Sequence, residues 1–294
     1  MMSYGENIIL MAETLHLESP AKVNLRLEIL KKREDGYHEI RTVLQKIGLH
    51  DTIRFSLRKG KGISIKSDHP DLPIGKSNLI YKALQSIIKG SNYQGGVRVE
   101  IEKRIPLGAG LGGGSSNAAI VMKAMNQLLG LNLSREKLME KGLEIGADVP
   151  FFFLEGAAVG SGIGERLKKI ELPNLWYVLI YPNFEVSTRW AYQNFVLTSK
   201  RIHCNLDKLL KGSGGIPGIL FNHLESVVLE KYPQINMMKE ILSSVGAMGA
   251  MMTGSGPTVF GLFQNEKSAA EAYERIKKSV ARRGWIIYKA HSIL

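Results

Sequence analysis

The chain has 294 residues, of which 44% are hydrophobic and 22% charged, and its single cysteine, Cys204, excludes an internal disulfide. These values are typical of a globular protein with one large domain or two modest ones, and they exclude a disulfide-stabilised scaffold. The lack of a disulfide fits a reducing cytoplasm. The net charge of +12 reflects either solubility alone or an anionic partner, such as nucleic acid, an acidic membrane or phosphorylated small molecules.

The distribution of charge narrows these alternatives. Basic residues stand in short scattered groups such as Lys31-Lys32-Arg33, without interleaved aromatic residues, which weakens the case for a nucleic-acid stripe. The uncharged stretch 241–265 is broken by Thr253-Gly254-Ser255-Gly256-Pro257 and predicts a helix end, a loop and a strand, not a membrane span. No secretory signal is evident near the N-terminus, where residues 1–14 have two interpretations, a loose extension or a true start at Met11.

The first predicted elements are strands with alternating apolar residues. Residues 20–30 predict a strand with Val23, Leu25, Leu27 and Ile29 on one face. After an Asp35-Gly36 turn, 52–57 and 62–67 predict a hairpin around Gly60–Gly62. Residues 77–90 predict a helix with Ser77 or Asn78 as its cap and Gly90 as its stop. The next strand, 96–106, has Val97, Val99 and Ile101 on one face.

The rest of the chain mixes helices and strands. Apolar residues at three- and four-residue spacing between Ala118 and Leu129 predict a buried helix closed by Gly130. Ser134 caps a second helix that ends near Gly146. A buried strand at 176–182, a helix at 267–283 and a last strand at 285–293 complete an α+β protein. Glycines and charges cluster at 156–172, so we expect two domains, 1–164 and 165–294.

The segment 106–116 asks for a special explanation. Five glycines fall between Gly108 and Gly114, directly before a helix. Glycines let the backbone approach a ligand closely, and the first turn of a helix adds free amides and a positive dipole end. A turn without a ligand needs only one or two glycines, so this segment predicts a phosphate-binding loop.

Three common phosphate loops fit poorly. Gly108, Gly110 and Gly113 match the dinucleotide fingerprint, but the helix that follows leads into a second helix containing Glu136, where a strand with an acid is needed. A Walker A loop needs a lysine between Gly114 and Ser115. The His-Arg-Asp and Asp-Phe-Gly tripeptides of protein kinases do not occur. The remaining pattern is an ATP loop of the form P-x-G-x-G-L-G-x-G-S-S.

This loop resembles the second motif of the GHMP kinase superfamily. "SPAKVNLRLEI" (19–29) and "MMTGSGPTVFGLF" (251–263) resemble its first and third motifs, in the same order. "R-x-D-G-Y-H" at 33–38 and "GADVPFF" at 146–152 are similar to the branch that phosphorylates 4-diphosphocytidyl-2-C-methylerythritol in non-mevalonate isoprenoid synthesis. Relatives that act on homoserine, mevalonate or galactose share the loops but do not typically carry the 33–38 motif.

The resemblance implies a fold and an activity. The fold would be two α+β domains with the site in the cleft between them. The N-terminal domain would be ribosomal-protein-like with a left-handed β-α-β crossover, against the usual hand, and the C-terminal domain ferredoxin-like. The activity would be transfer of the γ-phosphoryl group of ATP to the 2-hydroxyl of the substrate, giving the 2-phosphate and ADP.

The resemblance also implies partners. ATP would be the co-substrate and Mg²⁺ would arrive with it, since the sequence shows no acidic metal cluster. The partner would be the diphosphocytidyl small molecule, with neither nucleic acid nor membrane, and the chain would be a cytoplasmic monomer or weak homodimer. The rival class is a basic nucleic-acid-binding protein, and the rival within kinases is a relative with another acceptor alcohol.

The implied catalytic residues are Lys22 and Asp148. Asp148 would orient and deprotonate the hydroxyl, and Lys22 would lower the pKa of Asp148 and stabilise charge on the phosphoryl oxygens. Without the resemblance, Asp148 fits a cap before Pro150 and Lys22 a lysine at a strand edge. Asn24 lies two residues beyond Lys22 on the same strand face and would hydrogen-bond the substrate.

The implied ATP-binding set is the glycine loop with two weaker neighbours. Ser115 or Ser116 would touch Mg²⁺ or only cap the helix. Lys103 and Asn78 are candidates near the adenine, with a solvated lysine and a helix cap as the alternatives. The loop residues are Pro106, Leu107, Gly108, Ala109, Gly110, Leu111, Gly112, Gly113, Gly114, Ser115 and Ser116.

The implied base-binding set lies in the 33–38 motif and beyond. A flat polar base needs an aromatic face and a hydrogen-bonding edge. By the resemblance, Tyr37 stacks on the cytosine and His38 reads its edge. Tyr192 would offer the opposing face, unless it only packs an amphipathic helix. Gly254-Ser255-Gly256 would line the diphosphate side, unless it is only a turn that enters a strand.

Overall fold

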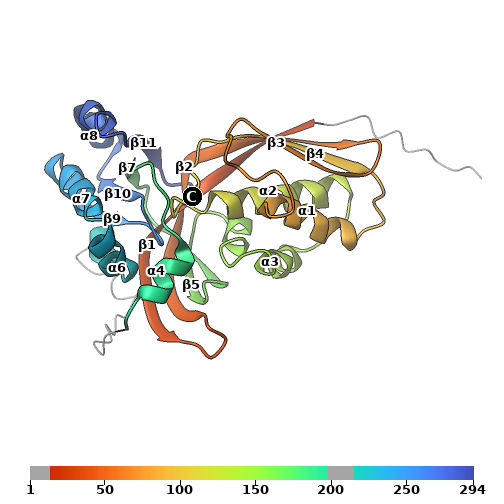
Figure 1. Cartoon of the computed structure of the whole chain (residues 1–294), viewed down its shortest axis with the longest axis horizontal. Coiled ribbons are helices and arrows are strands. Elements are labelled where there is room, and N and C mark those ends of the chain that lie inside the picture. Colours follow the sequence, from red (N-terminus) through yellow and green to blue (C-terminus); the bar gives the residue numbers. More distant parts are fainter. Residues whose placement is uncertain (1–13, 198–214) are drawn as a thin grey trace, which may run out of the picture.

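The computed structural model describes residues 14–197 and 215–294. Apart from Thr14, the segment 1–14, for which a loose extension or a start at Met11 was expected, lies outside the described residues. Two sheets form the frame, each covered by helices on one side (Figure 1). The mixture of antiparallel strands and helices confirms the α+β class. In the described residues no helix combines the length and apolar character needed to cross a membrane.

The first sheet is built around a long antiparallel pair. β1 and β2 pair along most of their length, and the order across the sheet is β3-β4-β2-β1-β8, with β5 added to β2 and β6 to β5. The strands are β1 (Thr14–Lys32), β2 (His38–Arg58), β3 (Gly62–Ser67), β4 (Gly96–Glu102), β5 (Ala157–Gly162), β6 (Arg166–Ile170) and β8 (Phe221–Asn222).

The predicted hairpin of 52–57 with 62–67 is wrong. β3 runs parallel to β4, and β4 lies between β3 and β2. The reason is burial: Val97 and Val99 of β4 are fully buried, whereas β3 buries only Ile65, so the more apolar strand takes the inner place. The Gly60–Gly62 turn therefore leads into a β3-α1-β4 crossover. The left hand expected for this crossover stays a prediction.

Three helices cover one face of this sheet (Figure 1). α1 begins after Asn78, whose Oδ1 accepts the Ile80 amide, and ends at Gly90, as predicted. Ser134 caps α3 in the same way. The buried stripe after the glycine loop is confirmed, with Val121 and Met122 fully buried. The helices are α1 (Leu79–Lys89), α2 (Gly113–Leu128) and α3 (Arg135–Leu143), followed by the short 3₁₀ helix η1 (Pro150–Phe153).

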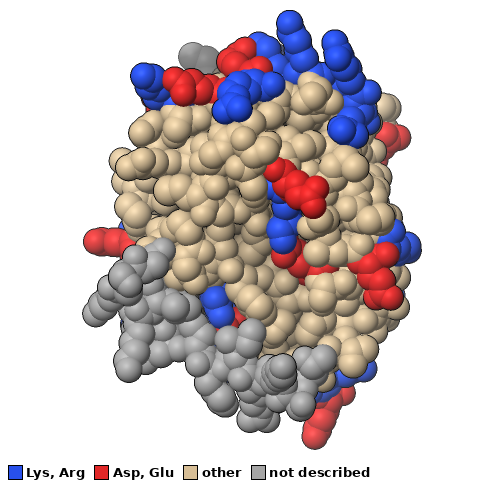
Figure 2. All heavy atoms as spheres, turned by 90° about the vertical axis from the view of Figure 1, so that its left-hand side faces the viewer, with Lys and Arg blue, Asp and Glu red and all other residues tan. Residues whose placement is uncertain are grey.

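The second sheet is antiparallel, in the order β11-β7-β10-β9, and three helices lie against it. Figure 2 shows the face that these helices form: charged side chains gather along its upper edge, where Figure 1 places α8, and much of its centre is uncharged. The elements are β7 (Trp176–Tyr181), α4 (Thr188–Asn194), η2 (Ile216–Ile219), α6 (Leu224–Lys231), α7 (Gln234–Ser244), β9 (Gly249–Met252), β10 (Val259–Phe263), α8 (Glu266–Ala281) and β11 (Ile286–His291).

The middle of β1 is buried on both faces. Val23 and Leu25 belong to the apolar core between the two sheets, as their alternation predicts. The intervening polar side chains are also buried, with Lys22 and Asn24 each 4% exposed. Because polar strand residues ordinarily face water, a row of buried ones needs partners inside the protein. These partners are found at the cleft described below.

The division into domains 1–164 and 165–294 stays a prediction. The proposed boundary falls in the turn between β5 and β6, and these two strands pair with each other in the first sheet. β8, from the second half of the chain, also joins this sheet through Arg26 and Leu27 of β1. The two halves are therefore linked by backbone hydrogen bonds as well as by packing.

Candidate active site

A cleft of about 1050 Å³ opens among the β1–β2 hairpin, the glycine loop, α4 and the second glycine loop. Most of the predicted site residues line it, although they come from distant parts of the chain. Asn78 and Ser116 are not among the lining residues. The predicted residues that do line it are Lys22, Asn24, Tyr37, His38, Lys103, Pro106, Leu107, Gly108, Ala109, Gly110, Leu111, Gly112, Gly113, Gly114, Ser115, Asp148 and Tyr192.

An ammonium and a carboxylate meet in this cleft. Lys22 Nζ lies 3.4 Å from Asp148 Oδ2 and donates to Asn24 Oδ1 at 2.6 Å. The Lys22 side chain is 5% exposed and that of Asp148 is 42% exposed, so the carboxylate faces the open cleft. Asn24 Nδ2 in turn donates to Thr42 Oγ1 at 2.9 Å, which fixes the orientation of the amide. A fixed ammonium beside an accessible carboxylate suits an acid–base step on a bound alcohol.

The first glycine loop packs directly on its neighbours. Gly110 and Gly112 both have positive φ, and a Cβ on Gly110 would overlap the Thr253 carbonyl oxygen. A Cβ on Gly112 would lie 3.0 Å from Lys22 Cγ. By contrast, the nearest atom to a Cβ on Gly114 would be 3.5 Å away, an ordinary contact. Some of the glycines are therefore required by packing between loops and not only by ligand approach.

A buried carboxylate that the sequence did not reveal anchors this loop. Asp51 is fully buried, and its Oδ1 accepts the amides of Arg104 and Ile105, each at 2.9 Å. Its Oδ2 forms an ion pair with Lys103 and accepts from Asn117 Nδ2 at 2.9 Å. Lys103 is thus a buried ion-pair partner at the edge of the cleft, not a solvated lysine. Its partner lies 52 positions earlier, beyond any local pattern.

Two predicted ATP-binding side chains point elsewhere. Ser116 is fully buried and its Oγ accepts from Ser19 Oγ of β1 at 2.8 Å, so the side chain ties α2 to the sheet. Asn78 caps α1 with its Oδ1 and donates from Nδ2 to the Pro73 carbonyl at 2.5 Å. Both side chains have structural partners in the described residues.

The second glycine loop is held by two residues that sequence reasoning missed. Thr253 is fully buried, and its Oγ1 accepts a hydrogen bond from the backbone amide of Asn24 at 2.8 Å. Asn222 Nδ2 donates to the carbonyls of Met252 and Gly254, each at 2.8 Å. Gly254 and Ser255 line the cleft. A polar pair far apart in sequence thus fixes this loop against β1, and nothing in the local pattern marks it.

The aromatic end of the cleft lies at the β1–β2 turn and α4. Tyr37 is 59% exposed, and the rings of His38 and Tyr192 lie 5.4 Å apart at 33°. Burial, with the nearby Lys32 charge, lowers the pKa of His38, so its imidazole is neutral at pH 7. A neutral imidazole offers one donor and one acceptor. Burial, with the Asp148 charge, raises the pKa of Tyr192, which keeps its hydroxyl protonated.

The groups that line the cleft suit a nucleotide. Among residues 14–197 and 215–294, no three His, Cys, Asp or Glu side chains gather as a metal site. Residues at the start of α2, the three lysines Lys22, Lys32 and Lys103, and several aromatic rings line one continuous space. This combination suits a polyphosphate at one end and a planar base at the other.

The chain matches two family models. The model described as GHMP kinases N terminal domain matches residues 78–156, and that described as GHMP kinases C terminal matches residues 205–282. A solved structure of homoserine kinase from Cytophaga hutchinsonii shares the fold, with a TM-score of 0.75 and 21% identity over 97% of this chain and 96% of that one.

Closer similarities distinguish one branch. The 4-diphosphocytidyl-2-C-methyl-D-erythritol kinase of Syntrophus aciditrophicus is 44% identical over 95% of this chain and 99% of its own length. That of Geobacter sp. strain M21 is 42% identical with the same coverage. A crystal structure of 4-(cytidine 5'-diphospho)-2C-methyl-D-erythritol kinase superposes with a TM-score of 0.82 at 31% identity, covering 95% of this chain and all of that one. The chain therefore belongs to the 4-diphosphocytidyl-2-C-methyl-D-erythritol kinase family within the GHMP kinases.

Proposed function

We propose that this chain catalyses the ATP-dependent phosphorylation of the 2-hydroxyl of 4-diphosphocytidyl-2-C-methyl-D-erythritol, giving the 2-phosphate and ADP, a step of non-mevalonate isoprenoid precursor synthesis. The observation that carries the proposal is the ion pair of Lys22 and Asp148, 3.4 Å apart between a glycine loop and an aromatic pocket. This arrangement supplies positioning and charge neutralisation, which phosphoryl transfer needs most.

The reacting centre follows from this geometry. Backbone amides within 107–115 bind the polyphosphate, and the start of α2 stabilises its negative charge. Asp148 accepts the proton of the 2-hydroxyl as the new O–P bond forms and the bond to the departing ADP breaks. Lys22 neutralises charge on the transferring phosphoryl oxygens. The Ser115 hydroxyl lines the cleft and would offer an oxygen ligand to a Mg²⁺ ion carried by ATP, which would neutralise charge on the phosphates.

The base end supplies recognition. Two stacking gaps of roughly 3.5 Å each need about 7 Å between rings, whereas His38 and Tyr192 are 5.4 Å apart. This spacing leaves no room for a base between His38 and Tyr192, so we place the cytosine between Tyr37 and Tyr192, with His38 at its edge. The neutral imidazole matches a base edge that carries both a donor and acceptors. Asn24 contacts the methylerythritol unit, and Lys103 remains the candidate cation on the ATP side.

The proposal includes the chain's surroundings. We propose a cytoplasmic monomer or weak homodimer that binds neither nucleic acid nor membrane. The positive charge then serves two polyanionic small molecules, ATP and the diphosphocytidyl substrate.

Measuring ADP release from the purified protein tests this function. Wild type should release ADP only when the diphosphocytidyl substrate is present, and cytidine nucleotides should compete with that substrate. Asp148→Asn should lower kcat by roughly 10²- to 10⁴-fold with a small change in KM, because general-base catalysis contributes about this much. Equal ADP release from both proteins would remove Asp148 from the chemistry. ADP release that does not depend on the diphosphocytidyl substrate would overturn the assignment of this substrate as the phosphoryl acceptor. The alternative would then be a GHMP kinase that acts on another alcohol.

A further inference from the structure

The turn that presents Tyr37 is held by polar contacts from two residues beside it. The Tyr37 amide donates to Asp35 Oδ1 at 3.1 Å, and the Arg33 amide donates to the Tyr37 carbonyl at 2.8 Å. The Arg33 guanidinium contacts both carboxylate oxygens of Asp35, with its shortest bond 2.8 Å from Nη2 to Oδ2. The Asp35 carboxylate thus holds the Tyr37 backbone amide, and the Arg33 guanidinium holds that carboxylate, whereas the bond to the Tyr37 carbonyl comes from the Arg33 backbone.

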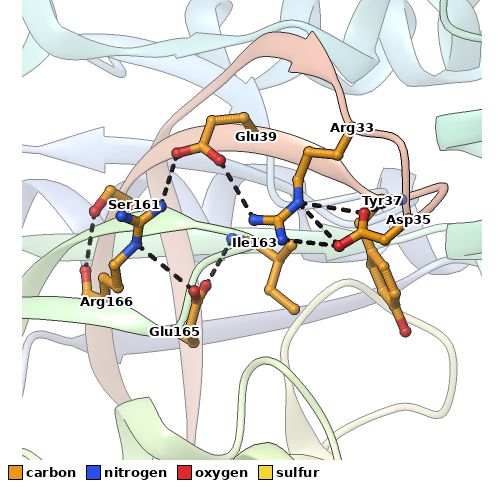
Figure 3. A network of polar contacts seen from close by, with 8 residues as sticks. All are labelled: Arg33, Asp35, Tyr37, Glu39, Ser161, Ile163, Glu165 and Arg166. Carbon is orange, nitrogen blue, oxygen red and sulfur yellow. Dashed lines mark hydrogen bonds and ion pairs between the residues drawn. The ribbon is translucent and has the colours of Figure 1, made fainter.

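The same arginine connects this turn to a second wall of the cleft (Figure 3). Arg33 Nη1 donates to Glu39 Oε2 at 3.5 Å, and Glu39 Oε1 accepts from Arg166 Nη2 at 3.0 Å. Arg166 lies beside Glu165, whose Oε2 accepts the Ile163 amide at 2.6 Å. Ile163 lines the cleft. A continuous row of charged side chains thus runs from Tyr37 to the β5–β6 turn.

The charges in this row are complementary. The carboxylates around Arg33 all carry the opposite charge. The hydrogen bond and charge of Asp35, with the charges of Glu39 and Glu165, raise the pKa of the Arg33 guanidinium, and the hydrogen bond from Arg33 lowers the pKa of Asp35. Because its pKa is lowered, the Asp35 carboxylate stays ionised even somewhat below its ordinary value of 3.8, so its ion pair with Arg33 is fully charged at neutral pH.

Such a row can matter although its members are partly exposed. Isolated surface ion pairs stabilise little, but bidentate arginine–carboxylate pairs and networks are the exceptions. An aromatic ring that is already fixed loses less conformational freedom when a base stacks on it. The contribution is therefore to substrate binding, where it appears in KM, and not to the chemical step.

We propose that Arg33 is a positioning residue: with Asp35, Glu39 and Arg166 it forms a clamp that fixes Tyr37 in its base-stacking position against the β5–β6 turn. The proposal rests on the proposed function in one respect, the assignment of Tyr37 to the cytosine. The clamp itself is a property of the free protein and is testable without substrate.

The kinetic test compares two matched arginines. Arg33→Gln keeps a polar side chain but removes the charge and the fork. Arg98→Gln is its control, because Arg98 also pairs with a carboxylate two residues on, Glu100, at 3.0 Å on a half-exposed strand away from the cleft. Arg33→Gln should raise KM for the diphosphocytidyl substrate roughly threefold to fivefold, with kcat and the KM for ATP within about twofold. Arg98→Gln should change none of them.

A double-mutant cycle with Tyr37→Ala sharpens the test. If Arg33 acts through Tyr37, the second substitution adds little to the first, so the two effects on KM fall short of their product. Fully multiplicative effects would show that Arg33 acts independently and would overturn the proposal. A fall in kcat with KM unchanged would also overturn it.

Amide hydrogen exchange separates the clamp from the function. In Arg33→Gln without substrate, peptides that cover 33–40 should exchange several-fold faster than in wild type or Arg98→Gln, because Tyr37 loses its ordered neighbours. Unchanged exchange of the peptides that cover 33–40 would contradict the clamp, even if the enzyme is active. If Arg33→Gln speeds exchange but the wild-type protein shows no substrate-dependent ADP release, the clamp is supported and the proposed function is rejected.

Discussion

The two ends of the cleft are built in opposite ways. At the phosphate end, backbone amides and buried polar side chains meet from distant parts of the chain, as in the contacts of Asp51 with Lys103 and Asn117. At the base end, an exposed turn presents Tyr37, and its contacts come mostly from residues within six positions. The comparison teaches that the phosphate end is held by buried contacts between distant segments, whereas the turn at the base end is held by contacts among partly exposed neighbours.

The largest expected effect comes from removing the buried carboxylate of Asp51 at the phosphate end of the cleft. Asp51→Asn leaves the Lys103 ammonium buried without its counter-charge, and breaking a buried pair lowers the free energy of unfolding by about 3–5 kcal/mol. Urea unfolding measures the loss. Asp68→Asn is the matched control, since this exposed carboxylate accepts the Lys103 amide at 2.9 Å, and it should change stability by less than about 1 kcal/mol. Similar losses from both would contradict the role of Asp51.

The glycines of the first loop give the next largest effect. Gly110→Ala places a Cβ against the Thr253 carbonyl at a positive φ, so we expect a loss of roughly 2 kcal/mol or more in unfolding free energy. Gly114→Ala has room and lies in the first turn of α2, so we expect it to retain or raise stability by up to about 1 kcal/mol. Thermal unfolding of the two variants measures the difference. Equal losses would mean that packing does not select among these glycines.

At the base end of the cleft, we expect a substitution to change substrate binding rather than the stability of the fold. Tyr37→Ala should raise KM for the diphosphocytidyl substrate, since stacking on a base contributes about 1–3 kcal/mol, with a smaller change in kcat. Steady-state kinetics with saturating ATP measures both. An unchanged KM would count against the stacking role, and a large loss of stability would show that the turn is not independent of the core.

The smallest expected effect concerns a buried lysine beside the catalytic segment. Lys46 Nζ donates to the Phe152 carbonyl of η1 at 3.2 Å, and Lys123 donates to the same oxygen at 3.0 Å. Burial, strengthened by the charges of Lys123 and Lys169 and opposed by that of Glu155, lowers the pKa of Lys46 from 10.5 to about 7.

The sign of the resulting pH dependence follows from proton counts. Between pH 7 and 10.5 the unfolded chain holds a proton on Lys46 that the folded chain has released, so the unfolding free energy rises with pH in this window. The rise from this residue between pH 7 and 8 is about 1 kcal/mol. Subtracting the urea-unfolding profile of Lys46→Met from that of wild type isolates it. A difference that does not vary with pH would contradict the lowered pKa.

Much of the fold and of the site was predictable because the signals are local. Helix stripes, the caps Asn78 and Ser134 and the strand at 96–106 depend on residues a few positions apart. The glycine loop was recognisable for the same reason. The motif resemblance supplied Lys22 and Asp148, whose residue types alone fit a strand edge and a cap.

Only the tertiary structure decided which of these local pieces meet. The partner of β3, the burial of Lys103 against Asp51 and the support of the second glycine loop by Asn222 join residues about 30 or more positions apart. Each depends on which surfaces exclude water together, and no short window of sequence contains that information. The sequence by itself thus determined the elements and the chemistry available to them. The pairing of β2 with β4, together with the packing of α2 on the same sheet, determined where a buried charge found its partner.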